Sequence, residues 1–241
     1  MKCVVLAGGK GARLRPYTHI FPKPLMPVGD LPVLEILIRQ MQACGIRQVI
    51  LTVGHLSELI RTFFGDGQRL GVEISYAYEE CPLGTAGPLS LIGGLTETFL
   101  VTNGDILTDL DLNALVDFHH DSRAAATIAM HTRQVHIDLG VIQLNGGSEI
   151  TDYIEKPTLS YNVSMGIYVF EPAVLACIPK GRYFDFPDLV KALLAAGHKV
   201  AGYAFDGYWQ DLGRPDDYEQ AIADYLADRD RFLPKTVCES D

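Results

Sequence analysis

The most informative stretch is KCVVLAGGKGARLRP, which covers residues 2–16. Its first part, residues 2–7, predicts a short buried strand that runs directly into three glycines and two arginines. The backbone N–H groups of glycines can approach an anion closely, because no side chain stands in the way. Lys10, Arg13 and Arg15 add positive charge. The stretch therefore predicts a phosphate-binding loop at the end of the first strand, with a plain tight turn as the alternative.

Two familiar nucleotide-binding loops are excluded here. A dinucleotide-binding fingerprint needs a third glycine, and that position is Leu14. A Walker loop needs Gly-Lys followed by Ser or Thr, which the stretch lacks.

Working outward from this loop, strands and helices alternate along the first half of the chain. We expect further strands at 48–53, 72–78, 99–102 and 125–131, and helices at 33–44, 58–64, 85–92 and 113–120. This order predicts a three-layer α/β/α sandwich with a Rossmann-like, mainly parallel central sheet. Ligands in such folds bind beyond the carboxyl ends of the strands, which points to the loops at 8–18, 78–85 and 103–105.

The second half of the chain is richer in predicted strands. Segments 140–144 and 150–154 predict a hairpin across Asn145-Gly146-Gly147, and 167–170 and 200–205 are further strands. Helices are expected at 187–196 and 215–227. We expect this half to extend the same sheet and to wall one side of the cleft, within a single domain over 1–227. A charged, frayed tail is expected over 228–241.

Composition narrows the class of protein. Of the 241 residues, 48% are hydrophobic and 21% charged, which is ordinary for a globular chain. The formal charge of −10 argues against a nucleic-acid or membrane partner, because both reward a basic surface. Five scattered cysteines without a CxxC pair indicate reduced thiols in a cytoplasmic protein. We expect no signal peptide and no membrane span.

A second motif is FPKPLMP, residues 21–27, in which Lys23 stands between two prolines on a stiff backbone. That setting suits a cation held in place at a charged ligand, although an ordinary surface lysine fits equally well. Taken together, Gly8-Gly9-x-Gly11-x-Arg13-Leu14-x-Pro16 and Pro22-Lys23-Pro24 resemble the sugar-1-phosphate nucleotidylyltransferases, also called NDP-sugar pyrophosphorylases.

The resemblance continues in the family's order over roughly residues 1–225. Matching segments lie at 82–89, 101–105, 139–141, 155–157, 166–168 and 209–215. The motifs are closest to mannose-1-phosphate guanylyltransferase-like members without the C-terminal β-helix that some relatives append. One departure is Ala12, which stands where a threonine is common and removes a hydroxyl donor near the phosphates. It implies reduced phosphate affinity at most.

The resemblance implies a fold of the nucleotide-diphospho-sugar transferase type and a Mg²⁺-assisted attack of a sugar 1-phosphate on the α-phosphorus of an NTP. It implies catalytic roles for Arg13, Lys23, Asp105 and Asp211, with Asp105 and Asp211 as Mg²⁺ ligands. The nucleotide-binding half, about 1–110, would use Leu6, Ala7, Gly8, Gly9, Gly11, Glu79, Pro82, Gly84 and Thr85. The sugar-phosphate half, about 111–227, would use Gly140, Glu155, Lys156 and Gly166.

Taken singly, the two aspartates have structural alternatives. Asp105 fits an Asx turn or a helix cap, and Asp211 fits a cap for the helix starting near Pro215. The partners that the resemblance implies are small molecules. Related enzymes are often oligomeric, which allows a homo-oligomer, but no residue in the sequence fixes that state.

The nucleotide base is expected to be read partly by Glu79. A carboxylate only accepts hydrogen bonds, which suits the N1–H and exocyclic amine of guanine, whereas relatives that use UTP or dTTP often carry glutamine there. GTP is therefore the leading nucleotide, with UTP or dTTP as the alternative. The sugar stays open among mannose, a heptose, glucose and amino sugars.

Two further functions were weighed. A nucleotide-sensing, non-catalytic subunit is disfavoured because Arg13, Lys23, Asp105 and Asp211 are all present. A nicotinamide-dependent dehydrogenase is disfavoured by Leu14 and by the segment around Lys23. The histidines add no chemistry to this prediction, since His119 and His120 are expected to end a helix without an acidic partner.

Overall fold

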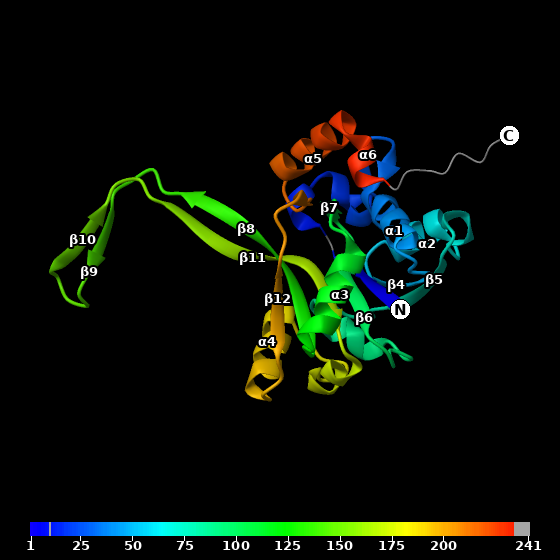
Figure 1. The fold of residues 1–241 in the computed structure, drawn as a ribbon. Coiled ribbons are helices and arrows are strands. Elements are labelled where there is room, and N and C mark those ends of the chain that lie inside the picture. The colour runs from blue at the N-terminus through cyan, green and yellow to red at the C-terminus, as the bar shows by residue number, and fades with distance from the viewer. Residues whose placement is uncertain (10, 234–241) are drawn as a thin grey trace.

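The computed structural model describes residues 1–9 and 11–233, and a seven-stranded sheet forms the centre of that part of the chain (Figure 1). Lys10 and Cys238 lie outside the described residues. In spatial order the strands are β12 (Val200–Ala204), β8 (Ala126–His136), β11 (Thr158–Phe170), β6 (Phe99–Asn103), β1 (Lys2–Leu6), β4 (Gln48–Val53) and β5 (Glu73–Tyr78).

The sheet is mainly parallel, as predicted. Strand β1 pairs in parallel with β4 and β6, so that Leu6 lies level with Thr52 on one side and Asn103 on the other. Strand β11 alone runs antiparallel to its neighbours β6 and β8. The carboxyl ends of β1, β4 and β6 therefore meet at one edge, where a ligand site is expected.

Side chains on the two faces of the sheet enter two separate apolar clusters. On β1, Cys3 and Val5 face one cluster and Val4 faces the other, because successive side chains of a strand point to opposite faces. The first cluster includes side chains of α1 (Val33–Ala43), α2 (Ser57–Phe64) and α3 (Leu112–Ser122). The second includes those of α4 (Phe186–Ala195). The predicted three-layer arrangement is thus confirmed.

A third cluster joins the C-terminal helices to the main body. Helix α5 (Pro215–Ala227) buries Tyr225, and the short α6 (Arg229–Phe232) buries Phe232 beside it. The expectation of fraying from residue 228 is wrong for Arg229–Leu233, because Phe232 is apolar enough to anchor this turn in the core. The rest of that segment, residues 234–241, lies outside the described residues.

Another expectation that fails is the helix over 85–92. That segment forms only the 3₁₀ turn Gly87–Leu91, with Pro88 in its first turn. An α-helix beginning at Thr85 would need Pro88 to donate a backbone hydrogen bond to Gly84, which proline cannot do, so the predicted helix cannot begin there. The turn still buries Pro88 and Leu89 against the sheet.

Two small ladders lie outside the central sheet, and one of them connects distant parts of the chain. Strand β7 (Ile106–Thr108) pairs antiparallel with β13 (Trp209–Asp211), and β2 (Pro27–Val28) pairs with β3 (Leu31–Pro32). The β7–β13 ladder places Asp211 opposite Ile106, directly after Asp105. It therefore brings together two carboxylates that are far apart in the sequence.

The predicted hairpin exists, but it does not wall the cleft. Strands β9 (Val141–Leu144) and β10 (Ile150–Ile154) form it, and they lie at the end of a long ribbon made by β8 and β11 (Figure 1). We call residues 132–162 the arm. The arm projects away from the body. The parts of β8 and β11 that lie outside the arm extend the main sheet together with β12, as expected.

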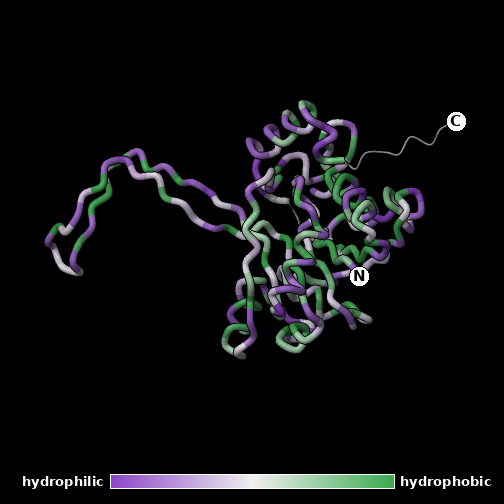
Figure 2. The backbone as a smooth tube through the Cα atoms, viewed as in Figure 1, coloured by the Kyte–Doolittle hydropathy of each residue, from purple (hydrophilic) through white to green (hydrophobic). Residues whose placement is uncertain are grey.

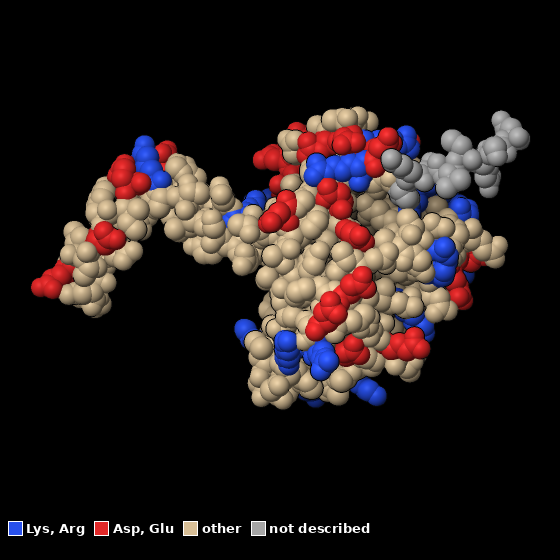
Figure 3. All heavy atoms as spheres, in the orientation of Figure 1, with Lys and Arg blue, Asp and Glu red and all other residues tan. Residues whose placement is uncertain are grey.

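On the face of the molecule shown in Figure 3, acidic side chains of α5 lie near basic side chains of α6. Among the described residues, no helix combines the length and apolar character that crossing a membrane requires.

Candidate active site

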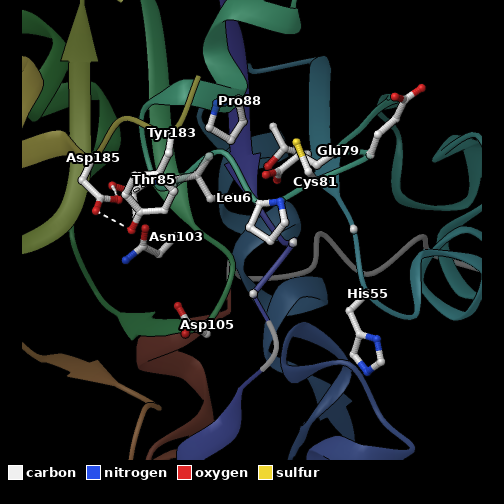
Figure 4. A pocket seen from close by; sticks show the side chains of 17 residues that line it. Leu6, His55, Glu79, Cys81, Thr85, Pro88, Asn103, Asp105, Tyr183 and Asp185 are labelled. Carbon is white, nitrogen blue, oxygen red and sulfur yellow. Dashed lines mark hydrogen bonds between the residues drawn. The ribbon is translucent and has the colours of Figure 1, made fainter. Parts of the chain in front are cut away.

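A cavity of about 830 Å³ lies at the carboxyl ends of β1, β4, β5 and β6. Eight of the residues predicted from the sequence line it, namely Leu6, Gly8, Gly9, Glu79, Pro82, Gly84, Thr85 and Asp105. Figure 4 shows Leu6 near the middle of this site, with Glu79 and Cys81 on one side and Thr85, Asn103 and Asp185 on the other. Ala7 is buried just behind, and its N–H donates to the carbonyl oxygen of Thr52 at 2.9 Å.

Glycine is required at two points of this lining. A Cβ at Gly8 would lie 2.6 Å from Oε1 of Glu79, so the strand end and the carboxylate approach only without a side chain. Gly84 has a φ of +81°, and a Cβ there would lie 2.7 Å from the carbonyl oxygen of Phe184. Both glycines therefore keep the walls of the cavity close together.

Glu79 is positioned by the loop that follows it. Its Oε2 accepts a hydrogen bond from the N–H of Leu83 at 3.2 Å, which ties the carboxylate to the segment 82–85. Burial raises the pKa of Glu79 above its ordinary value, and the bond from Leu83 opposes that rise. Its other oxygen, Oε1, faces Gly8 across the cavity.

Lys23 stands between the two predicted metal-binding aspartates. Its Nζ contacts Oδ2 of Asp105 and lies 3.5 Å from Oδ1 of Asp211. The side chain of Lys23 is only 10% exposed, whereas that of Asp211 is 43% exposed. The N–H of Leu212 donates to the carbonyl oxygen of Asp105 at 3.0 Å, which fixes the two backbones beside each other.

Arg13 reaches the same cluster from the glycine-rich loop. A Cβ placed on Gly213 would lie 2.9 Å from Nη2 of Arg13 and 3.1 Å from Oδ1 of Asp211, so both side chains meet over this glycine. Arg13 and Asp211 also line a second cavity of about 400 Å³, together with Arg133 and Arg214. Gly11 lies at the start of the turn that carries Arg13. The four predicted catalytic side chains are therefore neighbours.

The carboxylates of Asp105 and Asp211 lie close together, because both face the buried ammonium group of Lys23. As carboxylates, they offer hard oxygen donors. Two carboxylates, completed by water and phosphate oxygens, are the kind of ligand set that Mg²⁺ uses. Across residues 1–9 and 11–233 no group of three or more His, Cys, Asp or Glu side chains is placed to hold a metal. Asp105 and Asp211 thus fit a metal that is shared with a phosphate ligand.

The predicted sugar-phosphate residues are not brought to the cavity as a group. Gly166 lies beside it, since a Cβ there would be 2.5 Å from Nδ2 of Asn103, which lines the cavity. Gly140, Glu155 and Lys156 instead lie on the arm, where Lys156 Nζ is 3.3 Å from Oδ1 of Asp138. The position of these three residues differs from the expectation, because the ribbon of β8 and β11 carries them away from the body.

Several lining residues were not singled out from the sequence. Asp185 accepts from Thr85 through the backbone N–H at 2.8 Å and the hydroxyl at 3.0 Å, and from the hydroxyl of Tyr183 at 2.7 Å. Burial opposes charge on Asp185, but these hydrogen bonds outweigh it and hold its pKa below the ordinary value. Because Asp185 directly precedes the helix that begins at Phe186, the sequence could indicate that it caps this helix. The sequence could not indicate its partner Thr85, which lies 100 residues away.

Thr52 and His55 were also missed, although both follow from the rule that ligands meet strand ends. Both line the cavity at the end of β4. The hydroxyl of Thr52 is buried and has no hydrogen-bond partner within the part of the chain that the structure describes. Buried hydroxyls without a partner are rare in folded proteins.

The expectation that His119 lacks an acidic partner is wrong. Its Nε2 lies 3.1 Å from Oε1 of Glu171, and its Nδ1 lies 2.8 Å from the hydroxyl of Thr127. Burial lowers the pKa of His119, although Glu171 opposes the shift. His119 and Thr127 are almost fully buried, so this constellation serves packing of α3 on the sheet and not the cavity.

With the geometry in view, comparisons with known proteins identify the family. A family model described as nucleotidyl transferase matches residues 2–228. The chain belongs to the nucleotidyl transferase family. The resemblance drawn from the glycine-rich loop and the Lys23 segment is thereby confirmed.

The curated nucleotidyl transferases that resemble the chain differ in their nucleotide. It is 38% identical to a UTP–glucose-1-phosphate uridylyltransferase of Synechocystis, over 94% of this chain and 64% of that protein. It is 39% identical to a mannose-1-phosphate guanylyltransferase of Mycobacterium tuberculosis, over 92% of this chain and 64% of that protein. The chain therefore spans somewhat less than two thirds of the length of these relatives.

A solved structure shares the fold of this chain. HddC from Yersinia pseudotuberculosis superimposes with a TM-score of 0.72 at 22% sequence identity, covering 93% of this chain and 99% of that one. At this identity the likeness concerns the fold alone.

Proposed function

We propose that the chain transfers a nucleotidyl group from a nucleoside triphosphate to a sugar 1-phosphate and releases pyrophosphate. The observation that carries this proposal is the convergence of Arg13, Lys23, Asp105 and Asp211 beside a cavity lined by the glycine-rich loop. Membership of the nucleotidyl transferase family supports it independently.

The reaction needs no activated side chain, because the nucleophile is already an anion. A phosphate oxygen of the sugar 1-phosphate bonds to the α-phosphorus, and the bond from that phosphorus to the pyrophosphate oxygen breaks. Two polyanions must approach each other, so catalysis depends on positioning and on charge neutralisation. The buried ammonium group of Lys23 suits the α-phosphate, and Arg13 suits the leaving pyrophosphate.

Asp105 and Asp211 are the residues that would hold Mg²⁺. Bound there, the metal would neutralise the phosphate charge and orient the reacting groups. Both carboxylates also lie against the ammonium group of Lys23, so they would hold the metal beside a cation of the chain itself.

We propose GTP as the nucleotide, read through Glu79. Oε1 of Glu79 is free of the bond that ties Oε2 to Leu83, and it suits the N–H donors of guanine. Since the curated relatives include both a guanylyltransferase and a uridylyltransferase, UTP or dTTP remains the alternative.

The direct test is a panel assay of pyrophosphate release with MgCl₂, the four common NTPs plus dTTP, and sugar 1-phosphates of mannose, a heptose, glucose and amino sugars. We expect release with one NTP–sugar pair, with GTP preferred, and a reduced GTP:UTP ratio in Glu79→Gln. An unchanged ratio would refute the assignment of Glu79. Nucleotide binding without turnover across the panel would favour a sensing protein instead.

A further inference from the structure

Residues 82–87 form a loop on the wall of the cavity, and a distant segment of the chain, residues 183–186, holds this loop. The N–H of Phe184 donates to the carbonyl oxygen of Leu83 at 2.8 Å. The N–H groups of Ala86 and Gly87 donate to the carbonyl oxygen of Phe184 at 2.9 and 2.8 Å. These bonds join backbone to backbone, so they do not depend on which side chain stands at position 185.

The side chain of Asp185 adds contacts that depend on its carboxylate. Oδ1 accepts from both the N–H and the hydroxyl of Thr85, and Oδ2 accepts from the hydroxyl of Tyr183. The backbone of the loop packs against the same carboxylate, since a Cβ on Gly84 would lie 2.8 Å from Oδ1. Figure 4 shows Thr85, Tyr183 and Asp185 together on one side of the cavity, which all three line.

Asp185 directly precedes helix α4 but does not cap it. An aspartate at this position commonly accepts from N–H groups of the first helical turn. The side chain of Asp185 makes no such bond, and the hydroxyl of Thr85 accepts from the N–H of Phe186 at 2.8 Å instead. The carboxylate of Asp185 is therefore used for the loop and not for its own helix.

Helix α4 is a fixed support for these contacts. Its residues Phe186, Leu189 and Leu193 are buried in the second apolar cluster, and Figure 2 shows hydrophobic and hydrophilic residues interspersed along this helix. One side of α4 is thus packed on the sheet. A loop that is bonded to the start of this helix is held in place relative to the sheet.

The same loop holds Glu79. Leu83 donates its N–H to Oε2 of Glu79 at 3.2 Å, and its carbonyl oxygen accepts from the N–H of Phe184. Leu83 therefore lies between the segment that Asp185 belongs to and the carboxylate that is proposed to read the base. Any shift of the loop would move the donor that orients Glu79.

We propose that Asp185 is a positioning residue for nucleotide binding, which holds the 82–87 loop, and through Leu83 the carboxylate of Glu79, in the arrangement that receives the nucleoside. This inference rests on the proposed function for the identity of the ligand. Asp185 does not act on the reacting phosphates, which are assigned to Lys23 and Arg13. Loss of its carboxylate should therefore weaken binding of the nucleotide and leave the chemical step unchanged.

The test is calorimetric titration of GTP, UTP and dTTP with MgCl₂ into the wild type and Asp185→Asn, compared for the nucleotide that the wild type binds most tightly. We expect about tenfold weaker binding in Asp185→Asn, the order expected for a hydrogen bond to a charged group. The KM for that nucleotide should rise by the same factor, with kcat unchanged. A purely structural role would reduce the active fraction and kcat and leave the dissociation constant unchanged, and that result would overturn the inference.

Asp188→Asn is the matched control, because Asp188 is an exposed aspartate in the first turn of the same helix. It should bind the nucleotide like the wild type. An equal loss in Asp188→Asn and Asp185→Asn would mean that any charge change at this end of α4 has the effect, and it would contradict the role given to the Asp185 contacts.

Two variants of Thr85 test the contact from its other side. Thr85→Ser keeps the hydroxyl and should retain the affinity, whereas Thr85→Val removes it and should weaken binding. Because Thr85→Val and Asp185→Asn disrupt the same contact, the double variant should bind no more weakly than the weaker of the two single variants. Losses that multiply in the double variant would show that Asp185 acts independently of Thr85, which would overturn the inference.

The binding measurements separate this inference from the proposed function. Weaker nucleotide binding in Asp185→Asn, in a chain whose wild type releases no pyrophosphate, would support the inference and refute the proposed reaction. Pyrophosphate release with equal nucleotide affinity in the wild type and Asp185→Asn would do the reverse. A wild type that binds none of the three nucleotides would overturn both.

Discussion

At the scale of single residues, the site depends on charges that are partly removed from water. Lys23 is largely buried and is balanced by Asp105 and Asp211, so its ammonium group is fixed before any substrate arrives. A preorganised cation of this kind costs no reorganisation when charge develops on a phosphate. Glu79 is the opposite case, because burial disfavours its charged form.

If Glu79 binds GTP as proposed, we predict that GTP affinity is sensitive to acid. Its pKa is raised by burial, so protonation begins above the ordinary pH range of a glutamate. A protonated carboxyl loses acceptor capacity for guanine N–H groups, and GTP affinity should be full above the raised pKa and fall as pH decreases through it. Calorimetric titration of GTP from pH 8 to pH 5 measures this fall.

Glu79→Gln is the matched variant for that titration, because an amide cannot titrate in this range. Its GTP affinity should be lower at pH 8 and should fall less than that of the wild type as pH decreases, because the only remaining loss comes from protonation of the GTP phosphates. A wild-type affinity that stays constant down to pH 5 would contradict the role given to Glu79.

At the scale of elements, the pairing of β7 with β13 decides which aspartates meet. Periodicity and glycine punctuation predicted strand β4 and helix α5 with the observed bounds, since local pattern is enough for such segments. Local pattern was not enough for residues 85–92, where Pro88 prevents an α-helix, or for Asp185, whose partner Thr85 lies far away in the sequence. Such contacts depend on the whole topology.

The contact between His119 and Glu171 joins helix α3 to the sheet, and both groups titrate. We predict that this contact makes the free energy of unfolding depend on pH. Burial lowers the pKa of His119, so the unfolded chain binds its proton first. Hydrogen bonds from Thr98 and His119 outweigh burial and lower the pKa of Glu171, which acts in the same direction at lower pH. The free energy of unfolding should therefore be full above about pH 6.5 and decrease as pH falls below it.

Urea unfolding at pH 7.5 and pH 5.5 measures this dependence. His119→Gln should flatten it, because glutamine does not titrate, while His120→Gln on the exposed side of the same helix should behave like the wild type. An equal pH dependence in His119→Gln and the wild type would show that other groups cause the loss.

At the scale of the whole molecule, the sheet brings predicted nucleotide-binding residues to one edge, whereas Gly140, Glu155 and Lys156 lie on the arm. Most of the predicted nucleotide-binding residues meet at one edge because parallel strands end together, which the sequence order alone implied. The direction of the arm could not be predicted in this way. The arm leaves the body where β8 loses its pairing with β12 after Met130, and no local pattern in residues 132–162 indicates that direction.

The measurement that tests the central claim most directly is the rate of Mg²⁺-dependent pyrophosphate release in two aspartate-to-asparagine variants, assayed with the NTP–sugar pair that the wild type prefers. Asp105→Asn removes a charge from the cluster around Lys23, and Asp117→Asn removes one from the exposed surface of α3. We predict a loss of about a hundredfold or more in kcat for Asp105→Asn, on the order expected when a preorganised electrostatic group is lost. Asp117→Asn should match the wild type, and equal activity in all three proteins would contradict the account.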